Sequence, residues 1–174
     1  MKNQLHLMAR YNRAVNGKLY GILGNLDAGD LSRGAGSFFG GIIGLLNHVL
    51  VADLGWLQAF RGGSLNLPAL NSPLLDIDHP GWGKILHEDF GDLRAERERF
   101  DDLFVSFVEE TPAETFLERT RMTHHSGAVR TFVLGEALMH VFNHQTHHRG
   151  AVSQILDEMG VENDYSNLLA LLME

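Results

Sequence analysis

Four of the ten histidines of the chain fall within nine consecutive positions, at His140, His144, His147 and His148. Apolar residues on both sides of this run recur every three or four positions, which predicts a helix over residues 134–159. Because each helical residue turns about 100° from the last, His140, His144 and His148 lie along one face, with His147 about 60° from His144. Imidazoles one turn apart can bind a single divalent ion, so this run indicates metal binding. Spacing alone does not choose among the four.

A metal held by two histidines of one helix needs a further ligand from elsewhere in the chain. His48 is the natural candidate, because the histidines at 140–148 need a partner, although it is a lone histidine in a segment whose other residues suit a bundle core. The alternative is a hydrogen-bonded core histidine, which is the commoner role of a single histidine in such a helix. Asp53 points about 140° away from His48, which favours a surface position or the orientation of a neighbour. His140 is followed by valine, so the H-E-x-x-H pattern of metalloproteases is absent.

Composition limits the remaining classes of function. With 174 residues, 44% hydrophobic and 21% charged, the chain is expected to form one globular domain over residues 1–174. Its net charge of −8 argues against a nucleic-acid partner. It has no cysteine, so nitrogen and oxygen ligands would hold any metal, and any reacting thiol would come from outside. Nothing resembles a signal peptide or a membrane span, which predicts a cytoplasmic protein without a membrane partner.

The rest of the chain predicts the elements that would position these histidines. A first amphipathic helix is expected over residues 8–26, followed by a polar exit over residues 27–36. A second helix is expected from Ser37, as its N-cap, to about Arg61. Residues 62–87 hold three of the four prolines and predict a long crossover. A third helix follows over residues 88–110, and its alternating charges are typical of a solvated face, at Arg94, Glu96, Arg97, Glu98 and Arg99.

Two shorter elements complete the prediction. Residues 116–123 and 128–133 flank a glycine-containing turn and predict a β-hairpin, with His124 and His125 exposed in the turn. Leucine-rich residues 166–173 predict a short terminal helix that docks on the bundle.

These features together resemble the DinB family of metal-binding four-helix proteins. The resemblance rests on SFFGGIIGLLNHVLVADLGWL (residues 37–57), the proline-containing crossover, the hairpin and HVFNHQTHHRG (residues 140–150). It implies an all-α four-helix bundle of up-down-down-up topology, with a long crossover, a short β-hairpin and a short C-terminal helix. It also implies a homodimer and a divalent ion, commonly zinc or nickel. By position, the ligands that it implies are His48, His144 and His148, with His140 and His147 as neighbours of the site.

The resemblance further implies a function, because some relatives are thiol S-transferases that use low-molecular-weight thiols. The leading hypothesis is a metal-dependent enzyme, either a transferase or a hydrolase. The transferase would be a thiol S-transferase that acts in stress or detoxification. The alternative is a non-catalytic, metal-binding, dimeric interaction protein in which the ion joins the second and fourth helices. The sequence assigns no catalytic residue: Glu136, Asp53 and Tyr11 are open candidates for a general base.

Overall fold

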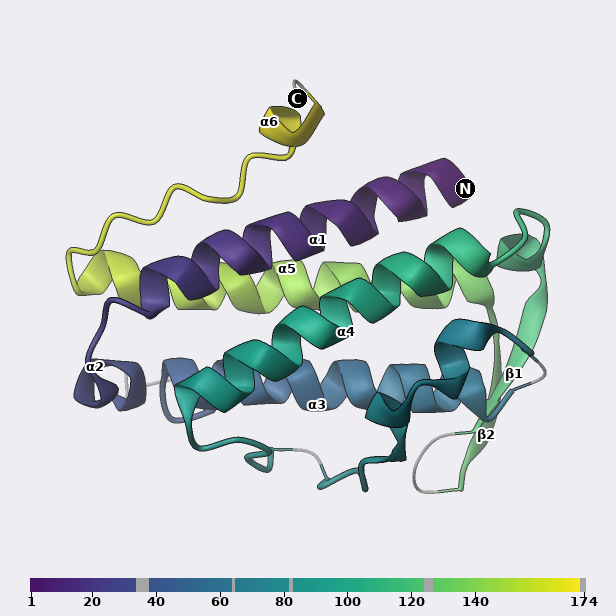
Figure 1. Ribbon diagram of the computed structural model, residues 1–174, viewed down its shortest axis with the longest axis horizontal. Helices are drawn as coiled ribbons and strands as arrows, with labels where there is room; N and C mark the ends of the chain where they lie inside the picture. Colours follow the sequence, from purple (N-terminus) through teal and green to yellow (C-terminus); the bar gives the residue numbers. More distant parts are fainter. Residues whose placement is uncertain (34–37, 64, 82, 124–126, 173–174) are drawn as a thin grey trace.

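The computed structural model of the protein describes residues 1–33, 38–63, 65–81, 83–123 and 127–172. Four long helices form its core: α1 (Lys2–Leu23), α3 (Ile42–Arg61), α4 (Phe90–Glu110) and α5 (Leu134–Glu158). Helices α1 and α5 run in one direction and α3 and α4 in the other (Figure 1). Helices α1 and α3 each pack against both α4 and α5. The predicted all-α bundle of up-down-down-up topology is therefore confirmed.

The apolar stripes of the four helices meet in a core rich in leucine and phenylalanine. The rings of Phe60 and Phe107 stack with centroids 5.3 Å apart. Phe104 meets Phe142 edge-on at 5.9 Å. These contacts join α3 to α4 and α4 to α5. Burying one such side chain contributes about 1.5–3 kcal/mol to the stability of the fold. Helix α3 has the length and composition of a membrane span, but 67% of the relevant window is buried inside the bundle, and this core position accounts for its apolar residues.

The start of α3 differs from the prediction, because glycines form a turn where the helix was expected to continue. The N-cap is Gly41, and Ser37, the predicted cap, lies outside the described residues. Gly40 and Gly41 have φ angles of 81° and 130°, which residues with a side chain rarely adopt. A Cβ on Gly44 would lie 1.7 Å from the carbonyl oxygen of Phe39. These three glycines therefore allow the turn to fold back onto the first residues of α3.

The segment before that turn contains an element that the sequence pattern does not reveal. Helix α1 ends at Leu23, and a short helix α2 (Ala28–Ser32) follows in the stretch predicted to be a polar exit. The side chain of Asp27 caps α2 by accepting a hydrogen bond of 2.8 Å from the backbone N–H of Asp30. A helix of five residues is too short to produce a recognisable hydrophobic period.

The long crossover contains two 3₁₀ turns, η1 (Pro68–Asn71) and η2 (Pro73–Asp76), each with proline at its first position. The buried amide of Asn47 holds its far end. This side chain donates to the carbonyl oxygen of His87 at 2.9 Å and accepts from the backbone N–H groups of Leu86 and His87. Asn47 precedes His48 in α3, so the crossover is fastened next to a predicted ligand.

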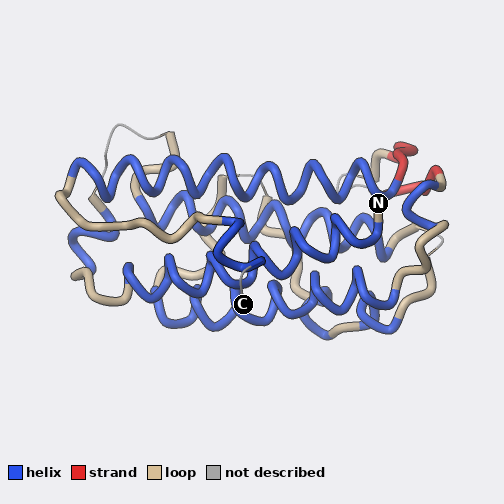
Figure 2. The backbone as a smooth tube through the Cα atoms, turned by 90° about the horizontal axis from the view of Figure 1, so that it is seen from above, coloured by secondary structure: helices blue, strands red, loops and turns tan. Residues whose placement is uncertain are grey.

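The predicted hairpin is confirmed, with β1 (Arg119–Thr123) antiparallel to β2 (Val129–Val133). It follows a 3₁₀ turn, η3 (Thr115–Leu117), and lies at the end of the bundle where the chain begins (Figure 2). His124 and His125 lie outside the described residues. The terminal helix α6 (Leu168–Leu172) follows an extended segment that returns along α1 (Figure 1). The Tyr11 hydroxyl fastens this segment by donating to the carbonyl oxygen of Ser166 at 2.7 Å.

Candidate metal centre

Three histidines converge between α3 and α5, and we call them the histidine cluster: His48, His144 and His148. One ring nitrogen of each lies within 4.8 Å of the other two. The Nε2 atoms of His48 and His144 are 3.2 Å apart. Two nitrogens that bind one tetrahedral ion at about 2.0–2.1 Å lie about 3.3 Å from each other. The cluster is therefore positioned to bind a metal ion.

The electrostatics of the histidine cluster favour neutral rings. Burial, which removes water from the charged form, and the charge of the neighbouring imidazoles together lower the pKa of each of the three histidines to about 4. Neutral imidazole has a free lone pair, so the rings are competent ligands at neutral pH. The Nδ1 atom of His48 is buried without a hydrogen-bond partner among the described residues. The nitrogen of His48 that faces His144 is Nε2, and this is the atom that the 3.2 Å contact places for an ion.

An aromatic side chain covers one side of the cluster. The ring of Phe39 stacks on His48 with centroids 4.2 Å apart and an interplanar angle of 22°. It also meets the ring of His148 edge-on at 5.6 Å. Phe39 is absent from the residues predicted for this site. The Gly40-Gly41 pair could have indicated this position of Phe39. Two glycines directly after Phe39 favour a turn there rather than a continuous helix.

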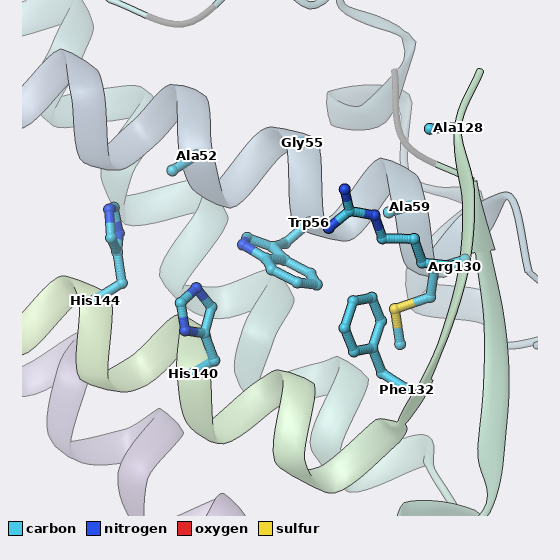
Figure 3. Close-up of a pocket in the computed structure, with 10 residues that line it drawn as sticks. Ala52, Gly55, Trp56, Ala59, Ala128, Arg130, Phe132, His140 and His144 are labelled. Carbon is cyan, nitrogen blue, oxygen red and sulfur yellow. The ribbon is translucent and has the colours of Figure 1, made fainter. Parts of the chain in front are cut away.

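A cavity of about 390 Å³ opens beside the cluster, between α3, α5 and the hairpin (Figure 3). Its described lining residues are Ala52, Gly55, Trp56, Ala59, Met122, Ala128, Arg130, Phe132, His140 and His144. His144 is thus both a member of the cluster and part of the cavity wall.

The two remaining histidines of α5 are neighbours of the cluster, as predicted. His140 lines the cavity, with its ring centroid 6.3 Å from that of His144 and 5.4 Å from that of Trp56. The ring of His147 meets that of His148 at 4.9 Å, and its side chain is exposed. The structure therefore brings two of the four histidines of α5, His144 and His148, together with His48 in the histidine cluster.

A second buried polar group, which we call the charge network, links all four long helices; it consists of Asn16, Asp53, Arg97, Asp101 and Gln145. Arg97 donates to Asp53 and forms an ion pair of 2.9 Å with Asp101. Gln145 donates to Asp53 at 2.8 Å, and Asn16 donates to Asp101 at 2.9 Å. Burial raises the pKa of Asp53 to about 6, against the opposing effect of the Arg97 guanidinium.

The charge network corrects two expectations from the sequence. Asp53 is fully buried, so the surface position considered for it is wrong, although it does orient Gln145. Arg97 has only 2% of its surface exposed, so it does not belong to a solvated face. The physical reason is that opposite charges from two helices compensate each other on burial, and the pattern within one helix does not reveal the partner.

The candidates for a general base have different surroundings. Tyr11 is buried and its hydroxyl is engaged with the carbonyl oxygen of Ser166, while Asp53 is enclosed in the charge network. Both therefore have structural partners. Glu136 is exposed in the first turn of α5.

Two comparisons place the chain among known proteins. The model of the DinB family matches residues 1–172. The chain is also similar to Protein DinB of Bacillus subtilis (strain 168), with 27% identity over 151 residues, which is 86% of this chain and 83% of the relative. The family match covers the histidine cluster, the crossover and the hairpin together.

Proposed function

This chain belongs to the DinB family, and we propose that it is a metal-dependent enzyme whose divalent ion is held by His48, His144 and His148. The observation that carries the proposal is the cavity of about 390 Å³ that reaches His144. A purely structural metal site is closed by four protein ligands, whereas a catalytic site keeps a position open to water or substrate. Three imidazoles beside a cavity have the second arrangement.

The chemistry that a bound ion, zinc or nickel, supplies here is Lewis acidity, which lowers the pKa of a water or thiol that it binds. The chain's own residues hold neutral imidazoles in place and surround the reacting groups with apolar walls. A thiol would be an external, low-molecular-weight one, because the chain has no cysteine. In thiol transfer, its sulfur bonds to an electrophilic carbon, the leaving group departs with the bonding electron pair, and the thiol proton passes to solvent.

A second candidate function is a non-catalytic, dimeric interaction protein in which the ion has a structural role. The observation that favours it is the origin of the ligands: His48 lies on α3, whereas His144 and His148 lie on α5. An ion bound by all three would cross-link two helices, and its binding energy would then add to the stability of the fold.

The first test is elemental analysis of protein purified without added metal. We expect about one zinc or nickel ion per chain, lost in His48→Ala and in His144→Ala. The matched control is His147→Ala, which changes an exposed neighbour outside the triad and should keep the ion. An ion retained in all variants would contradict the assignment of the ligands.

The second test separates the two functions. The metal-loaded protein is incubated with small thiols and electrophiles, and thiol consumption is measured beside the folded His144→Ala variant. Consumption that requires both the ion and His144 supports the enzyme. Absent turnover, together with a sharp fall in thermal stability on chelation, supports the interaction protein.

A further inference from the structure

The hairpin contributes one face to the cavity beside the cluster, and its register determines which residues lie there. Met122 pairs with Arg130, and Thr120 pairs with Phe132. Directly opposed residues of an antiparallel pair share a face, and so do residues two apart in a strand. Met122, Arg130 and Phe132 therefore point to the cavity together, in agreement with its lining. Arg121, one position from Met122, lies on the opposite face.

The wall formed by α3 explains why there is space at this point. Ala52, Gly55 and Ala59 recur at three- and four-residue intervals and line the cavity with little side-chain volume. Trp56 adds a half-buried indole, with its ring centroid 6.0 Å from that of Phe132. The cavity thus has an aromatic side and a shallow apolar floor, and its volume suits a small organic molecule.

Arg130 gives this apolar cavity a positive charge. Its side chain is directed from β2 toward α3 (Figure 3), and it is exposed. No carboxylate of the described residues forms an ion pair with it, in a chain whose net charge is −8. A guanidinium binds a carboxylate through two parallel hydrogen bonds, and an apolar surrounding strengthens that contact.

We propose that this cavity selects small organic carboxylates, with the carboxylate on Arg130, an aryl or alkyl body against Trp56 and Met122, and the reacting end directed to His144. Small organic carboxylates would be the substrate class of the proposed enzyme. Only the placement of the reacting end at His144 rests on the proposed function. Recognition of the acid by Arg130 involves no ligand of the ion, so it can be measured as binding, with or without turnover.

The test compares 3-phenylpropionate with 3-phenylpropanamide, its neutral counterpart of the same shape, by calorimetric titration of the zinc-loaded and the chelated protein. We expect the acid to bind about tenfold more tightly than the amide, in both forms of the protein. Arg130→Gln should abolish this preference. Arg121→Gln, which removes the same charge from the opposite hairpin face, should preserve it. Ala52→Leu, which fills the floor, should weaken both compounds.

Several outcomes would overturn the inference. Equal binding of acid and amide, or no binding at millimolar concentration, would remove the carboxylate preference. A preference that survives Arg130→Gln but disappears on chelation would assign the carboxylate to the ion instead. If the protein binds no metal while the chelated form still prefers the acid, the proposed function fails and the carboxylate preference stands.

Discussion

The charge network is buried and the histidine cluster is partly buried, and the side chains of these two polar groups are paired in different ways. In the charge network, the Arg97 guanidinium lies between two carboxylates, and each carboxylate accepts a further hydrogen bond from an amide side chain. In the histidine cluster, three groups of the same kind face one another, and burial together with the charge of neighbouring imidazoles lowers the pKa of each. The first group pairs opposite charges that the chain itself supplies, although Asp53 Oδ1 and Arg97 Nε have no hydrogen-bond partner among the described residues. The second has the donor atoms for a cation that the chain itself does not supply.

The largest expected effect tests how far the charge network depends on Arg97. Arg97→Met leaves Asp53 and Asp101 buried without their shared cation, which should lower the free energy of unfolding by about 3–5 kcal/mol. Urea denaturation measures the change. Arg94→Met is the matched control on the same helix, because Arg94 forms an exposed pair with Glu98 and should cost less than about 1 kcal/mol. Similar losses for both variants would show that the network does not depend on Arg97.

Metal removal should act on the histidine cluster and leave the charge network intact. Zinc or nickel at a hundred times its dissociation constant should stabilise the fold by about 2.7 kcal/mol, because the ion binds the folded chain. Thermal unfolding with and without chelator measures this difference. It should vanish in His148→Ala and persist in Arg94→Met. A chelator effect that survives in His148→Ala would place the ion elsewhere.

The sequence predicts the histidine cluster better than the charge network, for a physical reason. Helical spacing places His144 and His148 on one face, and their need for a further ligand points to His48. The family resemblance selects these three, and the structure brings them together. The charge network depends on a pair 44 positions apart, Asp53 and Arg97. Periodicity reports which face a residue occupies within its own helix, and it carries no information about a partner on another helix.

The same limit applies to the surroundings of the cluster. The bundle, the crossover and the hairpin follow from periodicity, proline content and turn residues, and the structure confirms them. The turn that seats Phe39 depends on the φ angles of two glycines and on the missing Cβ of Gly44. The cavity depends on the small residues of α3 facing the hairpin, which is a property of packing between elements far apart in the chain.

Acidification should affect the two groups with opposite sign. Each histidine of the cluster has a folded pKa of about 4, below its unfolded value of 6.5, so the unfolded metal-free chain binds more protons and stability falls as the pH drops from 6.5 to 4. Asp53 has a folded pKa of about 6, above its unfolded value of 3.8, so it contributes the opposite slope below pH 6.

Burial raises the pKa of Asp101 as well, so two carboxyls of the charge network oppose the loss of stability that the three histidines cause on acidification of the metal-free protein. His144→Ala should reduce that loss by on the order of 1 kcal/mol, after allowance for solvent screening at a half-exposed ring. Urea denaturation at pH 7 and at pH 4.5 measures it. His147→Ala is the control, since its exposed ring lies outside the triad. An identical change in the free energy of unfolding between pH 7 and pH 4.5 for wild type and His144→Ala would contradict the assigned role of burial.

The smallest expected effect concerns how firmly the cluster is held for its ion. Phe39 stacks on His48, and losing this half-buried contact should cost about 0.5 kcal/mol of ring positioning, or roughly two- to threefold in the dissociation constant of the metal. Competition with a chromogenic chelator measures this constant for Phe39→Ala. The matched control is Phe38→Ala, which removes an adjacent ring that is 92% exposed. If both variants weaken metal binding equally, the stack does not position His48, and the helices alone hold the cluster as they hold the charge network.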